Sequence, residues 1–302
     1  MAELETRRMG RTEMRPKSLA LGAAWLAQGS EAETIEAIHH AIELGIDYVD
    51  TYPRHAEERW GKALAGGLRE KIYLQAKVSP PGPDKDYSSE TTRRSVENSL
   101  KQLQTDYLDS VLIHDPIAIE DPLSPGCALD ELLKMKEEGL VRHIGLGVRQ
   151  HEFHRVAIET GHIEVVLTFL DYNLLDQSVA QTTLPLARDY DVGIILASPL
   201  GMGSLTGVEP DIETEQRRHP GAKPKAHMMW QWCHERGVNI RHLAMQFCLA
   251  APVDGIVMVG PANKVQVEEA YEAATADVPI EIWRDFEAAF GVRPANVGFN
   301  DR

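Results

Sequence analysis

The chain has 302 residues, of which 43% are hydrophobic and 25% are charged, a composition typical of a globular protein with a continuous apolar core. Acidic residues outnumber basic ones by 46 to 31, and the resulting net charge of −15 disfavours nucleic acid as a partner. The sequence has neither the apolar region of a secretory signal nor an apolar run of membrane-spanning length, so we expect a cytoplasmic protein with no membrane partner.

Short apolar runs alternate with segments of helical periodicity, which predicts parallel strands joined by crossover helices. The runs predicted as strands are residues 19–22, 48–50, 72–77, 110–114, 143–148, 165–169, 193–197 and 255–259. The helical candidates include residues 33–44, 89–103, 128–138, 152–160, 225–236 and 264–274. Eight such units favour a closed (β/α)8 TIM barrel over an open doubly wound sheet, and we expect one barrel domain over residues 1–302.

Three segments lie outside this repeating pattern. Residues 6–17 are predicted to form a hairpin that covers the bottom of the barrel, and residues 280–290 are predicted to form an extra C-terminal helix. Residues 201–224 carry no clear strand or helix signal, and a connection of that length is typical of a lid or of a disordered excursion.

Ionisable residues follow the apolar runs of three consecutive predicted strands, namely Asp50, Lys77 and His114. In a barrel, the residues at the carboxyl ends of the strands build the active site. A carboxylate, an ammonium and an imidazole that meet there suit proton transfer, because Asp50 would orient Lys77 and Lys77 would tune a neighbouring acid. The alternative for each residue alone is a structural role, as a buried ion pair or a core histidine.

The remaining histidines and the cysteines show no pattern of metal ligands, so we expect no metal site. His39, His40, His151 and His154 are predicted to lie on the solvated faces of outer helices. The three cysteines are widely separated in sequence and are interpreted as reduced packing residues.

Four stretches of the sequence closely resemble the aldo-keto reductase superfamily, in particular its bacterial aldose and fucose dehydrogenase-like members. These stretches are GIDYVDT, DYSSETTRRSVENSLKQLQTDYLDSVLIHDP, EEGLVRHIGLGV and ASPLGMGSLTG. The resemblance implies a barrel that binds NADP or NAD in an extended pose and transfers hydride to or from a carbonyl carbon. It also implies an Asp, Tyr, Lys and His tetrad, in which Asp50, Lys77 and His114 match three positions.

The position of the tetrad tyrosine departs from the family pattern. The family has this tyrosine five residues after the aspartate, where the chain has His55, and Tyr52 stands where the family usually has a small residue. An imidazole titrates near neutral pH, so His55 can serve as the acid or base; Tyr52 can do so if its side chain turns into the site. The sequence leaves open whether His55, Tyr52 or neither fills this role.

The resemblance also points to residues that would hold the dinucleotide. After the seventh strand, the loop that contains Ser198, Leu200, Gly201 and Gly203 would wrap the pyrophosphate with its backbone N–H groups. Arg149, after the fifth strand, would contact a phosphate, a substrate carboxylate or simply Asp171.

The turn after the eighth strand resembles the adenosine-binding turn of the family. Its candidate residues are Gly260, Asn263, Lys264 and Gln266. Gln266 stands where the family frequently has an arginine for the 2′-phosphate, so the sequence does not choose between NAD and NADP.

We therefore expect an NAD(P)-dependent oxidoreductase that acts on a sugar or a related polyhydroxy carbonyl compound as its small-molecule partner. The altered tyrosine position keeps two alternatives open. One is a non-redox lyase, dehydratase or epimerase on the same barrel, and the other is a non-catalytic binding subunit. The sequence does not predict an oligomeric state.

Overall fold

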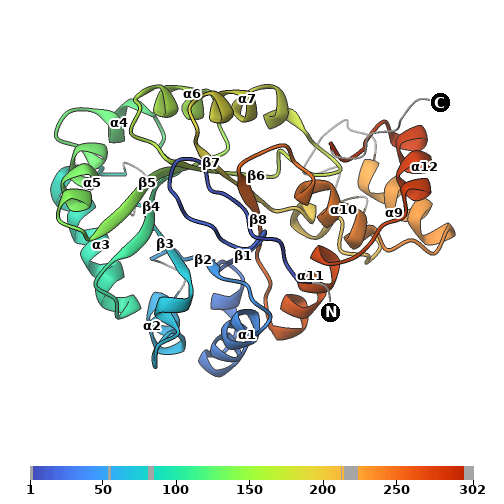
Figure 1. Cartoon of the computed structure of the whole chain (residues 1–302), viewed down its shortest axis with the longest axis horizontal. Helices are drawn as coiled ribbons and strands as arrows, with labels where there is room; N and C mark the ends of the chain where they lie inside the picture. The colour runs from blue at the N-terminus through green and yellow to red at the C-terminus, as the bar shows by residue number, and fades with distance from the viewer. Residues whose placement is uncertain (1–2, 54–55, 81–84, 212, 214–223, 296–302) are drawn as a thin grey trace.

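A closed barrel of parallel strands forms the centre of the molecule, and each strand pairs with the next in sequence order (Figure 1). The computed structural model describes residues 3–53, 56–80, 85–211, 213 and 224–295. The strands are β1 (Leu19–Gly22), β2 (Tyr48–Asp50), β3 (Tyr73–Val78), β4 (Leu108–His114), β5 (Val141–Gly147), β6 (Val165–Phe169), β7 (Gly193–Ala197) and β8 (Gly255–Val259). Strand β1 pairs with both β2 and β8, which closes the sheet and confirms the predicted TIM barrel.

Helices surround the strands on all sides in Figure 1. They are α1 (Glu31–Glu43), α2 (Glu57–Ala63), α3 (Ser89–Leu103), α4 (Glu120–Leu123), α5 (Ala128–Glu137), α6 (His151–Glu159), α7 (Thr183–Asp189), α9 (Lys225–Glu235), α10 (Ile240–Leu249), α11 (Lys264–Ala274) and α12 (Ile280–Phe290). In the described part of the chain, no helix combines the length and apolar character of a membrane span.

Side-chain caps fix where several helices begin. Ser30 and Glu33 form a reciprocal capping box at the start of α1, and Ser88 caps α3. Helix α10 was not among the helices predicted from the sequence, and most of its residues are buried.

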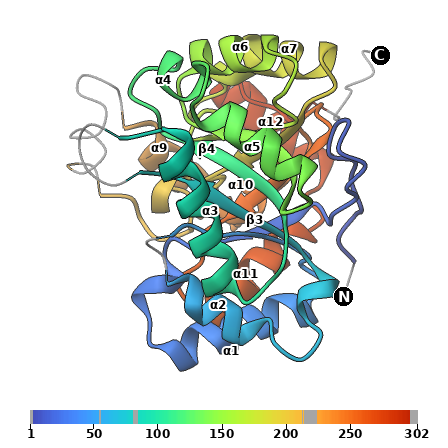
Figure 2. The same ribbon diagram turned by 90° about the vertical axis from the view of Figure 1, so that its left-hand side faces the viewer.

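The N-terminal segment closes the bottom of the barrel, as predicted. Thr6 bridges Lys17 in antiparallel fashion, and Gly10 bridges Val192, the residue just before β7, in the same way. The side chain of Met9 is fully buried among residues of the barrel interior. Figure 2 shows this segment in blue at one end of the barrel. The predicted C-terminal helix is also present, as α12.

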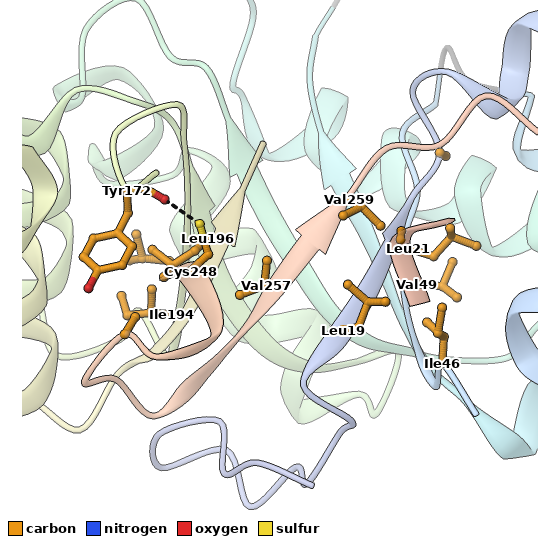
Figure 3. Packing of buried hydrophobic residues seen from close by; sticks show 14 of the residues in the cluster. Leu19, Leu21, Ile46, Val49, Tyr172, Ile194, Leu196, Cys248, Val257 and Val259 are labelled. Carbon is orange, nitrogen blue, oxygen red and sulfur yellow. Dashed lines mark hydrogen bonds between the residues drawn. The ribbon is translucent and has the colours of Figure 1, made fainter. Parts of the chain in front are cut away.

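Side chains alternate along each strand between the outside of the barrel, where they pack against the helices, and its interior, so two apolar regions form. Leu19 and Leu21 point outward to the helices and pack with Val49 of β2, as Figure 3 shows. Ala20 and Tyr48 belong instead to the interior of the barrel. Because side chains alternate along a strand, Asp50, two residues after Tyr48, also faces the interior.

Candidate active site

A buried ion pair joins the carboxyl ends of β2 and β3. The Nζ atom of Lys77 donates a hydrogen bond to Oδ2 of Asp50, and the two residues are only 8% and 5% exposed. Attraction between opposite charges strengthens when water is excluded, so the carboxylate holds the Lys77 side chain in one place. The structure therefore brings together the first two candidate catalytic residues.

Gln75 fixes the orientation of this carboxylate, a role that the sequence analysis missed. Its Nε2 atom donates to Asp50 Oδ1 over 2.7 Å, while its Oε1 atom accepts hydrogen bonds from Tyr48 at 2.8 Å and Ser110 at 3.0 Å. All of these side chains are buried. Because Gln75 and Lys77 are two residues apart on β3, they face the same side of the sheet, and this spacing is the sequence signal that would have found Gln75.

His114 lies at the end of β4, beside the same mouth of the barrel. Its Nδ1 atom is 3.3 Å from Oγ of Ser79, which follows β3. The same Ser79 hydroxyl lies 3.0 Å from the phenol oxygen of Tyr52, and the rings of Tyr52 and His114 are 5.1 Å apart between centroids. The structure thus places Tyr52 against His114. His55 lies outside the described residues.

The backbone around His114 is held firmly. The Tyr87 hydroxyl donates to the carbonyl oxygen of His114 over 2.6 Å, and Lys85 donates to the carbonyl oxygen of Asp115. Asp115 has a φ of 46°, in the left-handed region that L residues rarely adopt. Burial raises the pKa of the Asp115 carboxyl, against the positive charges of Lys85 and Lys77. Its Oδ2 atom lies 3.5 Å from His114 Nε2.

A second carboxyl group, Glu57 on α2, is buried near this cluster, and the sequence analysis did not single it out. The hydroxyls of Thr51 and Ser99 donate to its two oxygens over 3.3 and 2.9 Å. Burial raises the pKa of Glu57 to about 7, although these hydrogen bonds and the charge of Lys77 act in the opposite direction. Glu57 is therefore a neutral or half-ionised neighbour of the Asp50–Lys77 pair at neutral pH.

A groove of about 440 Å³ runs from the ends of β7 and β8 toward α10 and α11. The candidate cofactor-binding residues Ser198, Leu200, Gly203, Gly260 and Gln266 all line it. Since the carboxyl ends of the strands share one face of the barrel, the groove opens on the same face as the Asp50–Lys77 pair. The residues that line the groove do not include Asp50, Lys77 or His114, so the groove and these side chains are separate features of one face of the barrel.

Several residues of the loop after β7 have backbone conformations in the left-handed region. Ser198 and Met202 have φ values of 62° and 54°, and Gly201 and Gly203 have φ values of 58° and 99°. Left-handed conformations cost L residues roughly 1–2 kcal/mol each, and strain of this kind concentrates at functional sites. The short helical turn η4 (Gly201–Gly203) presents this backbone to the groove, while Gly201 itself is buried.

Trp25, in the loop after β1, forms the inner wall of the groove. Its side chain remains 42% exposed although it lies against Gly260. A Cβ atom at position 260 would come within 3.0 Å of the Trp25 ring, so glycine allows the indole to lie at the strand end. Trp25 thereby offers an exposed aromatic face to the groove beside Gly260.

Four other candidate cofactor residues do not line the groove, namely the buried Gly201 and also Arg149, Asn263 and Lys264. Arg149 is exposed and lies 3.5 Å from Asp176, whereas Asp171 contacts His151. Asn263 caps α11, and its Oδ1 atom accepts a hydrogen bond from the backbone of Gln266. Lys264 pairs with Glu36 on α1 over 3.0 Å, on the outer surface.

Arg241 and Glu269, which the sequence analysis did not single out, line the outer end of the groove. They form an ion pair of 3.2 Å between α10 and α11. Arg241 also donates from Nη2 and Nε to the carbonyl oxygen of Thr206, over 2.9 and 3.2 Å. Residues this far apart in sequence meet only through the packing of the two helices.

One histidine differs from its predicted surface position. His154 is fully buried, bonded to Thr183 and to the carbonyl oxygen of Val148, and burial lowers its pKa to about 4. The prediction was wrong because α7 covers this face of α6, which periodicity within α6 does not reveal. Across the described ranges, no group of three or more His, Cys, Asp or Glu side chains is arranged to hold a metal ion.

Residues 18–289 match the model of the aldo/keto reductase family. The chain is 30% identical to L-galactose dehydrogenase of Arabidopsis thaliana, over 91% of this chain and 89% of that protein. It is 24% identical to D-threo-aldose 1-dehydrogenase of a Pseudomonas species, over 86% and 88% of the two chains.

Solved structures share the same fold. An aldo-keto reductase from Bacillus halodurans, in its holo form, superposes with a TM-score of 0.80 at 24% identity, covering 99% of each chain. A second structure, of a Pseudomonas aeruginosa protein described as a putative aldo-keto reductase, gives a TM-score of 0.69 at 23% identity over 89% of this chain and 94% of that one.

Proposed function

Because the chain belongs to the aldo/keto reductase family of oxidoreductases, we propose that it transfers hydride between a nicotinamide dinucleotide, NADP or NAD, and a sugar or related polyhydroxy carbonyl compound. The observation that carries this proposal is that the cluster of Asp50, Lys77 and His114 and the groove of β7 and β8 lie on one face of the barrel. The relatives named as L-galactose and D-threo-aldose dehydrogenases support a sugar-like substrate.

The groove would hold the dinucleotide along its length. The backbone of Ser198, Leu200 and Gly203 would surround the pyrophosphate, and Trp25 would contact the inner end. The first turn of α11, to which Gln266 belongs, would add the positive end of a helix dipole. When bound, the nicotinamide ring accepts hydride from the substrate carbon or donates hydride to it.

Tyr52 would move the proton that accompanies hydride transfer. During oxidation, the Tyr52 phenolate would take the proton of the substrate hydroxyl while the substrate carbon loses hydride, and during reduction the Tyr52 phenol would return that proton as the carbon gains hydride. The ammonium of Lys77, held by Asp50, would supply positive charge at the side of the site where the proton moves. His114 would hydrogen-bond to the reacting oxygen and orient the substrate. The position of Tyr52 against His114 supports Tyr52 for this role.

A direct assay tests this function. The purified protein is incubated with L-galactose or a D-threo-aldose and with NAD+ or NADP+, and both reduced nicotinamide and sugar product are measured. We expect equal amounts of the two, with no turnover by Lys77→Met. Conversion of the sugar without change in the nicotinamide would support a lyase, dehydratase or epimerase instead, and the absence of dinucleotide binding would reject the proposal.

A further inference from the structure

Asp50, Gln75 and Ser110 form a row across three neighbouring strands in the interior of the barrel. Asp50 of β2 is the register partner of Gln75 of β3, and Gln75 is the register partner of Ser110 of β4. Register partners point to the same side of a sheet, so all three side chains face inward, and each residue is at most 5% exposed. By contrast, β6 and β7 contribute apolar side chains to the interior, such as Leu167 and Ile195. The polar row therefore occupies one sector of an otherwise largely apolar interior.

The hydrogen bonds along this row have a fixed direction. Tyr48, two residues before Asp50, and Ser110 both donate to Oε1 of Gln75, over 2.8 and 3.0 Å, and the two hydroxyl oxygens are 2.9 Å apart. Burial raises the pKa of the Tyr48 hydroxyl, so this group keeps its proton and remains a donor. Because Oε1 already accepts from two hydroxyls, the amide nitrogen of Gln75 faces Asp50. A reversed amide would place its oxygen against the carboxylate, with no proton between the two acceptors.

Asp50 is thereby held at both of its carboxylate oxygens. Gln75 Nε2 donates to Oδ1 over 2.7 Å, and Lys77 Nζ donates to Oδ2. Rotation of the carboxylate about its Cβ–Cγ bond would break both hydrogen bonds in a buried site, where unpaired polar groups are costly. The position of the Lys77 ammonium therefore depends on an amide and two hydroxyls that lie deeper in the barrel.

Resting on the proposed function, we propose that Gln75 is a positioning residue for hydride transfer and that Tyr48 and Ser110 act through it. The row fixes Asp50, Asp50 fixes the Lys77 ammonium, and the ammonium supplies positive charge where the proton of the substrate moves. Tyr48, Gln75 and Ser110 are fully buried, so they touch neither the substrate nor the dinucleotide. Their loss should therefore lower kcat and leave KM and dinucleotide binding unchanged.

The substitution Gln75→Met tests this inference, because it nearly keeps the shape of the side chain and removes the amide. Turnover is measured with L-galactose or a D-threo-aldose and with NAD+ or NADP+, whichever pair the wild-type protein uses. We expect kcat to fall by roughly 10- to 100-fold, the order of loss for misplaced catalytic groups, while KM and the dissociation constant of the dinucleotide stay within about twofold. A crystal structure of this variant without cofactor should show the Asp50 carboxylate turned from its wild-type orientation. An unchanged kcat, or a rise in KM alone, would overturn the inference.

A double-mutant cycle separates positioning from packing. Tyr48→Phe removes one donor to Gln75, and kcat should fall by about 3- to 10-fold, the cost of one hydrogen bond. In the Gln75→Met background the same change should lower kcat by less than about twofold, because the amide that Tyr48 acts through is already absent. Effects on kcat that simply multiply would contradict the proposal.

Tyr73→Phe is the matched control for Tyr48→Phe. The two rings are 6.3 Å apart between centroids, but the Tyr73 hydroxyl accepts a hydrogen bond from the backbone of Arg15, outside the row, so kcat should stay at the wild-type value. If Gln75→Met does not fold, the comparison of these two variants decides, and equal effects on kcat would overturn the inference alone. If the wild-type protein reduces neither dinucleotide with a sugar, the proposed function fails and this inference fails with it.

Discussion

Tyr52 and His114 share one hydroxyl group, that of Ser79, whose Oγ atom lies 3.0 Å from the phenol oxygen and 3.3 Å from His114 Nδ1. Tyr52 follows β2, Ser79 follows β3 and His114 ends β4, so three neighbouring strand ends meet at this point. The contact places a phenol hydroxyl beside the imidazole of His114, as the role proposed for Tyr52 requires.

Removal of the Tyr52 hydroxyl should therefore impair the chemical step. For Tyr52→Phe we expect kcat to fall by about 10²- to 10⁴-fold, the range for loss of a general acid or base. His55→Asn, as the comparison, should lose less than about tenfold. Steady-state kinetics would measure kcat for both variants, and circular dichroism would check that they fold. A larger loss of kcat in His55→Asn than in Tyr52→Phe would assign the proton transfer to His55.

Loss of one partner of the buried Asp50–Lys77 pair should destabilise the protein strongly. Asp50→Asn leaves a buried ammonium without its carboxylate, and loss of one partner of a buried pair costs about 3–5 kcal/mol. Urea denaturation measures the free energy of unfolding. In the exposed pair of Glu31 and Lys62, Glu31→Gln should cost less than about 1 kcal/mol. An equal effect at the two sites would show that burial of the first pair does not matter.

Glu57 should make the protein less stable as the pH rises from about 4.5 to about 7. Its pKa is about 7 in the folded protein and near 4.5 when exposed, so in this range the folded state retains a proton that the unfolded state has lost. The shift corresponds to up to about 3 kcal/mol. We expect Glu57→Gln to become more stable relative to wild type across this range, as measured by urea denaturation. The exposed neighbour Glu58, changed to Gln, should show no such trend.

His154 should make the protein less stable as the pH falls from about 6.5 to about 4, the opposite of the trend expected for Glu57. Burial lowers the pKa of His154 to about 4, against 6.5 for an exposed histidine. Between these two pH values the unfolded state therefore binds a proton that the folded state does not bind. Its contribution to stability is present above pH 6.5 and is lost as the pH falls to about 4, by up to about 3 kcal/mol. His154→Gln should weaken this acid sensitivity, measured by thermal unfolding at several pH values. His162→Gln, at an exposed position, should leave it intact.

The sequence by itself determined the barrel, because apolar runs and helical periods are local patterns that repeat along the chain. Bounds such as those of β6, β8, α3 and α12 follow from these patterns and from local caps. Asp50, Lys77 and His114 could also be chosen from sequence, since each follows an apolar run and parallel strands end on one face.

Only the tertiary structure decided which side chains meet. Tyr52 and His114 are far apart in sequence and lie together because β2, β3 and β4 are neighbours in the closed sheet. Arg241 and Glu269 meet through the packing of α10 on α11, and Lys264 is directed outward by Glu36. Contacts between side chains depend on how elements pack in three dimensions, and this packing leaves no periodic signal in the chain.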